Sequence, residues 1–251
     1  MKENHKIRGV IFDLGETLLN FGHVSKVGVF RQSARLTYDF LKSKPQPVGS
    51  FRGYLLKNLL YLRLQYGLSN IKGRDFDSLE LLKKVNRKLR LSEEQWEELL
   101  WLWYEPLGRL AKIESDIIET LMKLERLGLK LGILSNTFIH SSSLNRQLEN
   151  LKIMRFFSVR LYSYQFRFRK PDIRIFKAAA ETIGLEAKNI LYVGDRVSTD
   201  IIPAIKAGMR AVLKSAHTNH GKKLPPKAYA VSMLSELPAL INQINSIQKN
   251  K

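Results

Sequence analysis

Short apolar runs without strict alternation of polar residues occur at four places along the chain, each bounded by polar residues or glycine. They cover residues 8–14, 130–135, 189–194 and 209–214. Runs of this length and type are typical of strands that are buried on both faces of a parallel sheet. The hydrophobic pattern therefore predicts at least four buried parallel strands.

Helical patterns lie between these runs. Residues 115–127 place apolar side chains three and four positions apart and stop before Gly128, a residue that favours helix ends. Residues 199–207 contain Pro203, which a helix tolerates only in its first turn. Strand followed by helix, repeated along the chain, predicts an α/β fold with a doubly wound parallel sheet.

A further helix is expected over residues 171–183. Pro171 stands at its expected first position, and Gly184 follows its end. Its spacing predicts four inward-facing residues, namely Ile173, Phe176, Ala180 and Ile183.

One connection is far longer than the others. Asp13 and Ser135, at the ends of the first two predicted strands, are 122 positions apart, whereas a strand-helix-strand unit needs only about 30 residues. Helical patterns fill this interval at about 25–43, 50–66, 76–90 and 92–104, and the last opens with a capping-box sequence from Ser92 to Gln95. We expect residues 20–112 to form a helical insert over the carboxyl ends of the strands, and residues 1–19 and 113–251 to form the α/β core.

The composition narrows the class of protein. The chain has 251 residues, 44% of them hydrophobic and 26% charged, which is ordinary for a globular protein. No apolar run approaches the roughly 20 residues of a membrane span, and the first residues do not resemble a signal peptide. The absence of cysteine excludes disulfides and thiolate chemistry, so the cytoplasm is the expected location.

The net charge of +19, from 42 basic and 23 acidic residues, predicts an anionic partner. Residues 20–112 hold 17 basic and 9 acidic groups, and the other charges are scattered. Phosphorylated metabolites, nucleic acid and acidic surfaces are all anionic partners of this kind. Because the basic residues form neither a tail nor a dense stripe, nucleic acid is not the expected partner.

Polar signals follow the predicted strands or precede the helix at 171–183. They are Asp13, the pair Ser135 and Asn136, Lys170, and Asp195 with Asp200 five positions later. Each alone is also typical of a turn or a helix cap. The carboxyl ends of parallel strands meet at one edge of the sheet, where ligands bind in such folds, so the set together predicts a site.

These residue types suit phosphoryl transfer. Asp13 could attack phosphorus as a carboxylate nucleophile and form an aspartyl phosphate. Asp13 and Asp195, with a backbone carbonyl, would offer the oxygen ligands that Mg²⁺ prefers. Lys170 and the hydroxyl of Ser135 would hold phosphoryl oxygens, with Asn136 beside them. Two further residues take supporting positions, Thr17 in the loop after Asp13 and Asp200 against Lys170 or a metal-bound water.

The order Asp-x-x-x-Thr, Ser-Asn, Lys-Pro and Gly-Asp-x4-Asp resembles the haloacid dehalogenase superfamily. The resemblance covers about residues 7–20 and 113–240, and the helical insert is similar to the family's α-helical cap in placement and helicity only. It implies a Rossmann-like core, an aspartate nucleophile, Mg²⁺, and phosphatase activity on a small phosphorylated compound.

The first motif departs from the family pattern at two positions. Phosphatases of the family read Asp-x-Asp-Gly-Thr, and here Gly15 replaces the second aspartate while Glu16 replaces the glycine. The resemblance implies that residue 15 binds Mg²⁺ through its backbone carbonyl, which glycine retains. It also implies that the missing aspartate carries the proton to the leaving group, and losing such an acid slows a reaction by roughly 10²–10⁴-fold.

Three functions are compatible with this departure. The first is a slow or selective phosphatase that takes the proton from Glu16, His140, the cap or the substrate. The second is a binding or regulatory protein that keeps the phosphate site with weak or no catalysis. The third is a 2-haloacid dehalogenase, which needs no such acid. Such enzymes work without metal and lack this Gly-Asp, so Asp195 favours the phosphatase.

The insert offers few signals about specificity. Arg52, Lys57 and Tyr61 share a helical face, and Arg52 could reach an anionic substrate, although a solvated surface is the simpler interpretation. Arg167 and Arg169 flank Lys170 and could steer phosphate. The three tryptophans are expected to pack within the insert; they are Trp96, Trp101 and Trp103.

Overall fold

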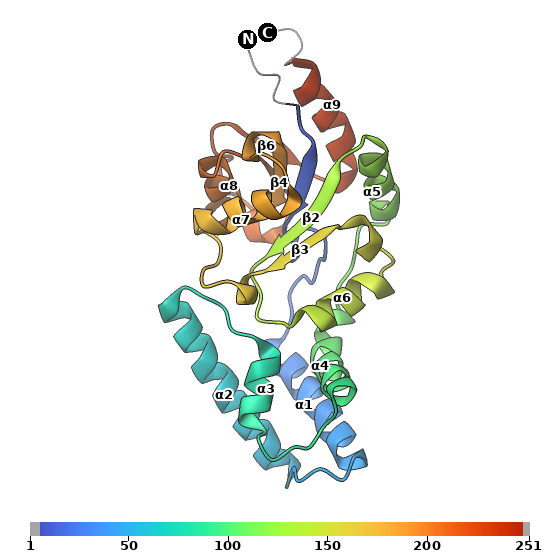
Figure 1. The fold of residues 1–251 in the computed structure, drawn as a ribbon, viewed down its shortest axis with the longest axis vertical. Helices are drawn as coiled ribbons and strands as arrows, with labels where there is room; N and C mark the ends of the chain where they lie inside the picture. Colours follow the sequence, from blue (N-terminus) through green and yellow to red (C-terminus); the bar gives the residue numbers. More distant parts are fainter. Residues whose placement is uncertain (1–5, 248–251) are drawn as a thin grey trace.

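The computed structural model describes residues 6–247, so residues 1–5 and 248–251 of the predicted core lie outside the described residues. Six parallel strands form one sheet in the order β3-β2-β1-β4-β5-β6 (Figure 1). The strands are β1 (Gly9–Phe12), β2 (Lys130–Ser135), β3 (Val159–Tyr162), β4 (Ile190–Gly194), β5 (Arg210–Lys214) and β6 (Ala228–Val231). The strand order reverses at β1, so the sheet is doubly wound, as predicted.

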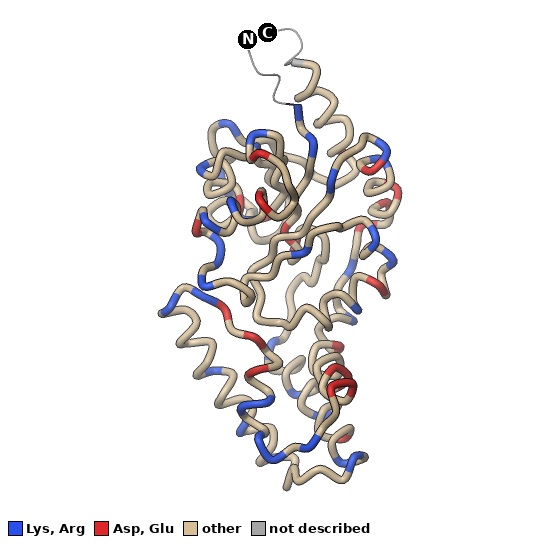
Figure 2. Tube along the Cα trace, viewed as in Figure 1, with Lys and Arg blue, Asp and Glu red and all other residues tan. Residues whose placement is uncertain are grey.

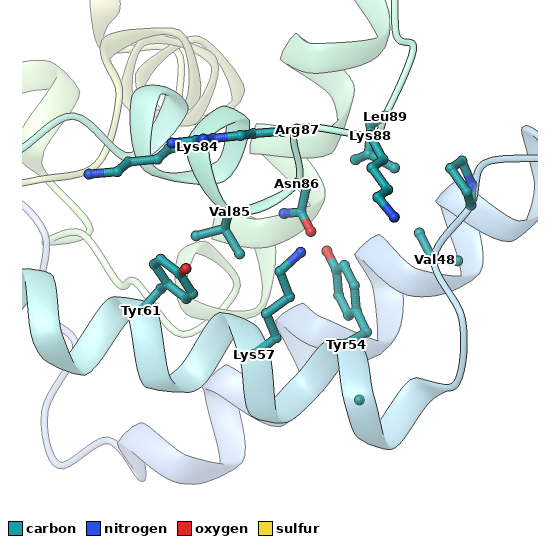
Figure 3. A pocket seen from close by; sticks show the side chains of 12 residues that line it. Val48, Tyr54, Lys57, Tyr61, Lys84, Val85, Asn86, Arg87, Lys88 and Leu89 are labelled. Atoms are coloured by element: carbon teal, nitrogen blue, oxygen red, sulfur yellow. The ribbon is translucent and has the colours of Figure 1, made fainter.

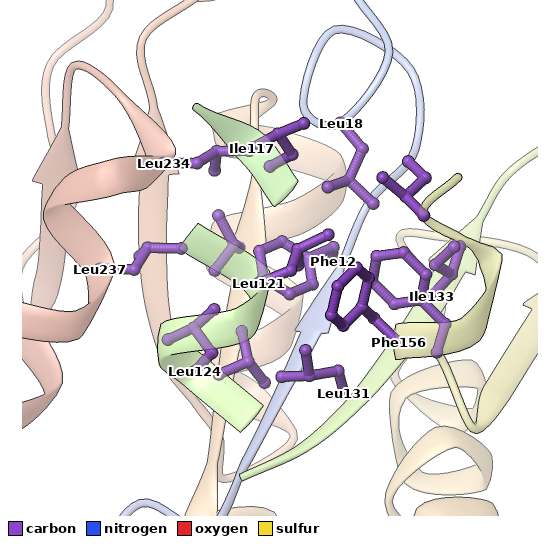
Figure 4. Close-up of a cluster of buried hydrophobic side chains, with 14 of the residues drawn as sticks. Phe12, Leu18, Ile117, Leu121, Leu124, Leu131, Ile133, Phe156, Leu234 and Leu237 are labelled. Atoms are coloured by element: carbon purple, nitrogen blue, oxygen red, sulfur yellow. The ribbon is translucent and has the colours of Figure 1, made fainter. Parts of the chain in front are cut away.

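Helices cover both faces of the sheet. One face packs against α5 (Ile117–Arg126), α6 (Ser141–Asn150) and α9 (Leu237–Ile247), and the other packs against α7 (Ile173–Ile183) and α8 (Ile202–Lys206). Side chains alternate along each strand, so Phe12 points to the first face and Ile11 to the second. Figure 4 shows Leu121 and Leu124 of α5 packed beside Phe12 in the first of these clusters.

Short helical turns connect these elements. They are η1 (Met154–Phe156), η2 (Ser163–Gln165), η3 (Ala187–Asn189), η4 (Val197–Ile201), η5 (His217–Asn219) and η6 (Leu234–Glu236). Segment η4 is a π-helix that runs directly into α8, and Pro203 falls in the first turn of α8. Pro203 therefore lies in the first turn of a helix, the only place where the sequence allowed it.

The hydrophobic pattern did not reveal two strands, β3 and β6. Both have only four residues, and both lie at the edges of the sheet with partly exposed side chains. An edge strand that mixes exposed and buried positions lacks the continuous apolar run of a central strand.

The predicted start of α7 was wrong. The helix begins at Ile173 instead of Pro171, with Asp172 as its N-cap, because the Asp172 side chain accepts a hydrogen bond from the backbone N–H of Arg174 (2.9 Å). Phe176, Ala180 and Ile183 are buried as predicted, whereas Ile173, now the first residue of the helix, is 37% exposed and Ile175 is buried. The peptide bond between Lys170 and Pro171 is cis.

The interval predicted as an insert, residues 20–112, contains four helices, α1 (Lys26–Ser43), α2 (Phe51–Lys72), α3 (Ser78–Val85) and α4 (Glu93–Gly108). α2 runs past its predicted end to a left-handed Gly73, whereas α3 is shorter than its predicted range. The capping box at Ser92 is present. These helices share an apolar cluster of their own, which includes Trp96 and Trp103, whereas Trp101 packs against the cluster on the sheet.

Two chain segments lead into and out of this helical insert. They pair as a single antiparallel bridge, in which Asn20 and Lys112 exchange backbone hydrogen bonds of 2.7 and 2.8 Å. Among the described residues, no helix is long and apolar enough to cross a membrane.

Candidate active site

The predicted site residues converge where the strand order of the sheet reverses. Asp13, Ser135 and Asp195 each lie at or directly after the carboxyl end of β1, β2 or β4, which are neighbours in the sheet. Phe12 is in register with Val193, and the Asp13 N–H donates to the Val193 carbonyl at 2.8 Å. This pairing brings the side chains of Asp13 and Asp195 to the same edge.

Lys170 lies at the centre of the site. Its Nζ donates to Asp13 Oδ1 (2.7 Å), Asp200 Oδ1 (2.6 Å) and the Tyr192 hydroxyl (2.9 Å). Burial alone would lower the pKa of Lys170, but the carboxylates of Asp13 and Asp200 outweigh it and the net shift is upward. The ammonium group therefore stays charged against Asp13.

Tyr192 was not predicted. Its fully buried hydroxyl lies 3.1 Å from Asp200 Oδ1, and burial together with Asp200 and Asp13 raises its pKa well above the usual value, so it stays a neutral phenol. The signal was a tyrosine within an otherwise apolar strand, since a buried tyrosine hydroxyl needs a partner.

Three buried carboxylates could hold a cation. Oxygen atoms of Asp13, Asp195 and Asp200 all lie within 4.8 Å of one another. Burial raises the pKa of Asp13 to about 7, and Asp200 and Asp195 add to the rise while Lys170 opposes it. Asp195 Oδ1 is buried and has no hydrogen-bond partner among the described residues. An unpaired buried carboxylate oxygen beside two other carboxylates fits a divalent metal ion.

The loop after β5 holds Asp195 in place. This role of the loop was not predicted from the sequence. The Thr218 hydroxyl donates to Asp195 Oδ2, and Asn219 Nδ2 donates to the Asp195 carbonyl at 2.8 Å. Gly194 allows this part of the site to close, because a Cβ there would lie 2.6 Å from the Cβ of Asp200.

Gly15 lies beside open space. A Cβ added to it would meet no atom within 4 Å, and its φ lies outside the left-handed region. Glu16, by contrast, has a φ of 57° and its carboxylate is engaged elsewhere. Its Oε1 accepts from the Phe21 N–H (3.0 Å), and its Oε2 lies 3.2 Å from His217 Nδ1.

Two expected side chains have different surroundings from those predicted. The amide of Asn136 exchanges hydrogen bonds with the backbone of Lys170, at 2.8 Å to its carbonyl and 2.9 Å from its N–H. Its side chain therefore fixes Lys170. The buried hydroxyl of Thr17 has no hydrogen-bond partner within residues 6–247. Ser135 is buried at the end of β2.

Comparison with known proteins identifies the family to which this chain is similar. Residues 10–214 match the family described as haloacid dehalogenase-like hydrolase. The chain belongs to this family. The predicted family resemblance and fold class are therefore confirmed.

Similar proteins agree with the family. A curated relative from Methanocaldococcus jannaschii, named glyceraldehyde 3-phosphate phosphatase, is 27% identical over 97% of this chain and 100% of its own length. A phosphatase structure from Thermococcus onnurineus aligns with a TM-score of 0.59 at 23% identity, over 94% of this chain and 98% of that one. A 2-haloacid dehalogenase structure from Pseudomonas syringae aligns with 0.60 at 20% identity, over 95% and 99%. At these identities, the two structures show the fold alone.

In this haloacid dehalogenase-like hydrolase, the loop after Ser135 is bound to the helical insert. The ring of Phe138 stacks on Phe76 with centroids 4.9 Å apart. Ser78 bonds this loop twice, from its N–H to the Phe138 carbonyl and through its hydroxyl to the His140 N–H, both at 2.9 Å. The insert therefore contacts the loop that begins at the predicted phosphate-binding residues.

Arg169 forms a second connection between the insert and the sheet. It lies 2.6 Å from Asp75 Oδ1 and 3.0 Å from Asn70 Oδ1, both in the segment where α2 ends. Asp75 also accepts from Ser163. The guanidinium of Arg169 is therefore held by Asp75, and its steering of phosphate stays a prediction. Arg167 is exposed.

An Asp75→Asn substitution is expected to lower the free energy of unfolding by about 1–3 kcal/mol, because it leaves Arg169 without its buried carboxylate. Urea unfolding followed by circular dichroism measures this change. The control is Asp39→Asn, which breaks an exposed pair with Arg35 and should change stability by less than about 1 kcal/mol. Equal effects of the two substitutions would contradict the role of Asp75.

Proposed function

We propose that this hydrolase is a Mg²⁺-dependent phosphatase for a small phosphorylated compound, working through an aspartyl phosphate on Asp13. One observation carries the proposal. Lys170 binds Asp13 Oδ1 in a buried site, and the unpaired oxygen of Asp195 lies beside them. The relative named glyceraldehyde 3-phosphate phosphatase, matched over its whole length, supports a phosphatase.

Asp13 is the nucleophile in this proposal. Lys170 holds Oδ1, and no hydrogen bond from a described residue reaches Oδ2, so Oδ2 is the oxygen that attacks phosphorus. A bond forms between Oδ2 and phosphorus as the bond to the leaving oxygen breaks. Water then attacks phosphorus and releases phosphate and the free carboxylate. Lys170 and the Ser135 hydroxyl hold the phosphoryl oxygens.

The side chains of Asp13 and Asp195 and the carbonyl of Gly15 would hold Mg²⁺. When bound, the ion neutralises the negative charge that the phosphoryl group and the carboxylates bring together. Asp200 keeps Lys170 in place, as its 2.6 Å contact indicates, and Asn136 fixes the backbone of Lys170.

The leaving oxygen lacks a dedicated proton donor in this site. Gly15 has no carboxyl group, and Glu16 is engaged by Phe21 and His217. The enzyme should therefore be slow, or selective for substrates whose leaving groups need little protonation. A binding or regulatory protein with weak or no catalysis is the alternative that Gly15 favours.

We also propose that residues 20–112 act as a cap and that the rest of the chain forms the core. The bridge between Asn20 and Lys112 supports this boundary, as does the apolar cluster within the insert. The cap then covers the edge of the sheet that carries Asp13.

The direct test is release of phosphate from p-nitrophenyl phosphate and from glyceraldehyde 3-phosphate, with and without Mg²⁺. Activity should require Mg²⁺ and vanish with EDTA. A parallel assay measures halide release from 2-chloropropionate in EDTA. Halide release without phosphate release would show that the protein is a dehalogenase. If neither phosphate nor halide is released, the protein is the binding or regulatory alternative.

Mg²⁺ affinity should increase with pH. Because the pKa of Asp13 is raised to about 7 without metal, Mg²⁺ must displace a proton below this pH, and its apparent affinity should fall by up to about tenfold per pH unit. Calorimetric titrations at pH 6 and pH 8, in buffers with different ionisation enthalpies, measure both the affinity and the proton released. Equal affinity at the two values would exclude Asp13 as a ligand.

A further inference from the structure

A cavity lies in the helical insert, at the end remote from the sheet. It has a volume of about 420 Å³ and is formed by the start of α2, the end of α3 and the loops beside them. Figure 3 shows the amino groups of Lys57 and Lys88 directed toward the side chains of Tyr54 and Asn86. Lys84 and Arg87 complete its basic lining.

The polar floor of this cavity is held in place. The Tyr54 hydroxyl donates to Thr37 Oγ1 (3.1 Å), and the Asn86 amide donates to Asn58 Oδ1 (3.3 Å) and the Leu82 carbonyl (3.1 Å). Tyr54 and Asn86 are both buried. These contacts give the cavity a fixed shape without a ligand.

Two loops that form its wall are joined. Gln46 Nε2 donates to the Arg90 carbonyl (3.0 Å), and the Arg90 N–H donates to Gln46 Oε1 (2.8 Å). This exchange fastens the loop that contributes Pro47 and Val48 to the loop that contributes Lys88. The lining is therefore preorganised.

The charge of the lining is unbalanced. Its charged residues are all basic, and no acidic side chain of the described chain forms an ion pair with any of the four. Lys83, one position away, does pair with Glu93. Figure 2 shows the basic segments along α2, α3 and the loop after α3. The amino groups of Lys57 and Lys88 face the same space and repel each other, and an anion between them would relieve this repulsion.

We propose that this cavity binds a small polyanion with two or more phosphate groups. Lys57 and Lys88 would contact one group within the cavity, and Lys84 and Arg87 a second at its rim. The cavity is remote from Asp13, so it is not the substrate site (Figure 1). An anion-binding cavity would also account for part of the excess of basic residues in 20–112. Its lining includes Lys57 and Tyr61, two of the three residues that the sequence placed on one face of α2.

A small ligand fits better than a nucleic-acid duplex. The outer surface of α2 next to the cavity exposes leucines, with Leu56, Leu60 and Leu64 each more than half exposed. A duplex needs cations that continue along its phosphate backbone, and an apolar surface interrupts them here.

The test uses sodium tripolyphosphate, titrated calorimetrically without Mg²⁺ at physiological salt. Without Mg²⁺ the three carboxylates around Lys170 disfavour an anion at the Asp13 site. The wild-type protein is compared with Lys57→Gln/Lys88→Gln and with the control Lys26→Gln/Lys42→Gln, which removes the same charge from exposed lysines elsewhere on the insert. The first variant should bind about tenfold more weakly or worse, and the control should bind within about twofold of the wild type.

Equal weakening in both double variants would overturn the proposal, because net charge alone would then explain binding. So would a DNA or RNA duplex that binds more tightly than tripolyphosphate and loses affinity in the same variant. The single Lys88→Gln change, in an exposed loop position, gives the same comparison if the double variant is unstable. Phosphatase activity should be unchanged in the cavity variant, so failure of the proposed function would show separately.

Discussion

An Asp13→Asn variant is expected to lose phosphate release by at least about 10⁴-fold, the scale seen when a nucleophile is removed. The asparagine amide has nearly the same shape as the carboxylate but cannot form the acyl phosphate. Lys170 would lose one of its two carboxylate partners and keep Asp200. The loss should appear in kcat, since the other phosphate-binding groups remain.

The same variant should remain folded. The pKa of Asp13 lies above its usual value, which means that burial disfavours the ionised carboxylate in the folded protein relative to the unfolded chain. A neutral amide therefore removes an unfavourable charge, and this offsets the lost contact with Lys170. Thermal unfolding at pH 8 checks this point.

The matched control for Asp13→Asn is Asp39→Asn, the same chemical change on the exposed surface of α1. It should retain the wild-type rate. If Asp13→Asn instead keeps activity within about tenfold of wild type, Asp13 is not the nucleophile. Equal residual activity in every preparation, including the active-site variant, would identify a contaminating phosphatase.

The sequence predicted the centre of the sheet and the cluster around Lys170 for a common physical reason. Central parallel strands are buried on both faces, so they are continuous apolar runs, and the polar residue that ends each run marks the same edge of the sheet. Asp13, Lys170 and Asp200 were expected together on this basis, and the structure brings their side chains into direct contact.

Features that depend on packing between distant segments were not predictable in this way. In the sequence, Tyr192 is one residue of an apolar strand. Its role follows only from the hydrogen bond that Lys170 donates to its hydroxyl. Thr218 follows Asp195 by 23 positions, in a loop without a distinctive pattern. Arg169 stands next to Lys170 in sequence, yet its partner Asp75 lies just after the C-terminal end of α2. Such contacts arise only once the insert and the sheet are placed together.

A Gly15→Asp variant is expected to be faster than the wild type, by up to roughly 10²-fold on substrates with poor leaving groups. A Cβ at this position meets no atom within 4 Å and the backbone needs no left-handed φ, so the substitution introduces no clash at the Cβ. A group that protonates the leaving oxygen helps an alkyl phosphate far more than p-nitrophenyl phosphate, whose leaving group is already stable as an anion.

The ratio of kcat/KM for glycerol phosphate to that for p-nitrophenyl phosphate is therefore the decisive measurement. Gly67→Asp is the matched control, because a Cβ at Gly67 also meets no atom within 4 Å and the position lies on the exposed surface of α2. The ratio should rise for Gly15→Asp and stay constant for Gly67→Asp. A uniform decrease in both rates would mean that another group already supplies the proton or that chemistry is not the slow step. In that case Glu16 is the first residue to test, because a rate loss in Glu16→Gln would mean that it leaves Phe21 and His217 during turnover.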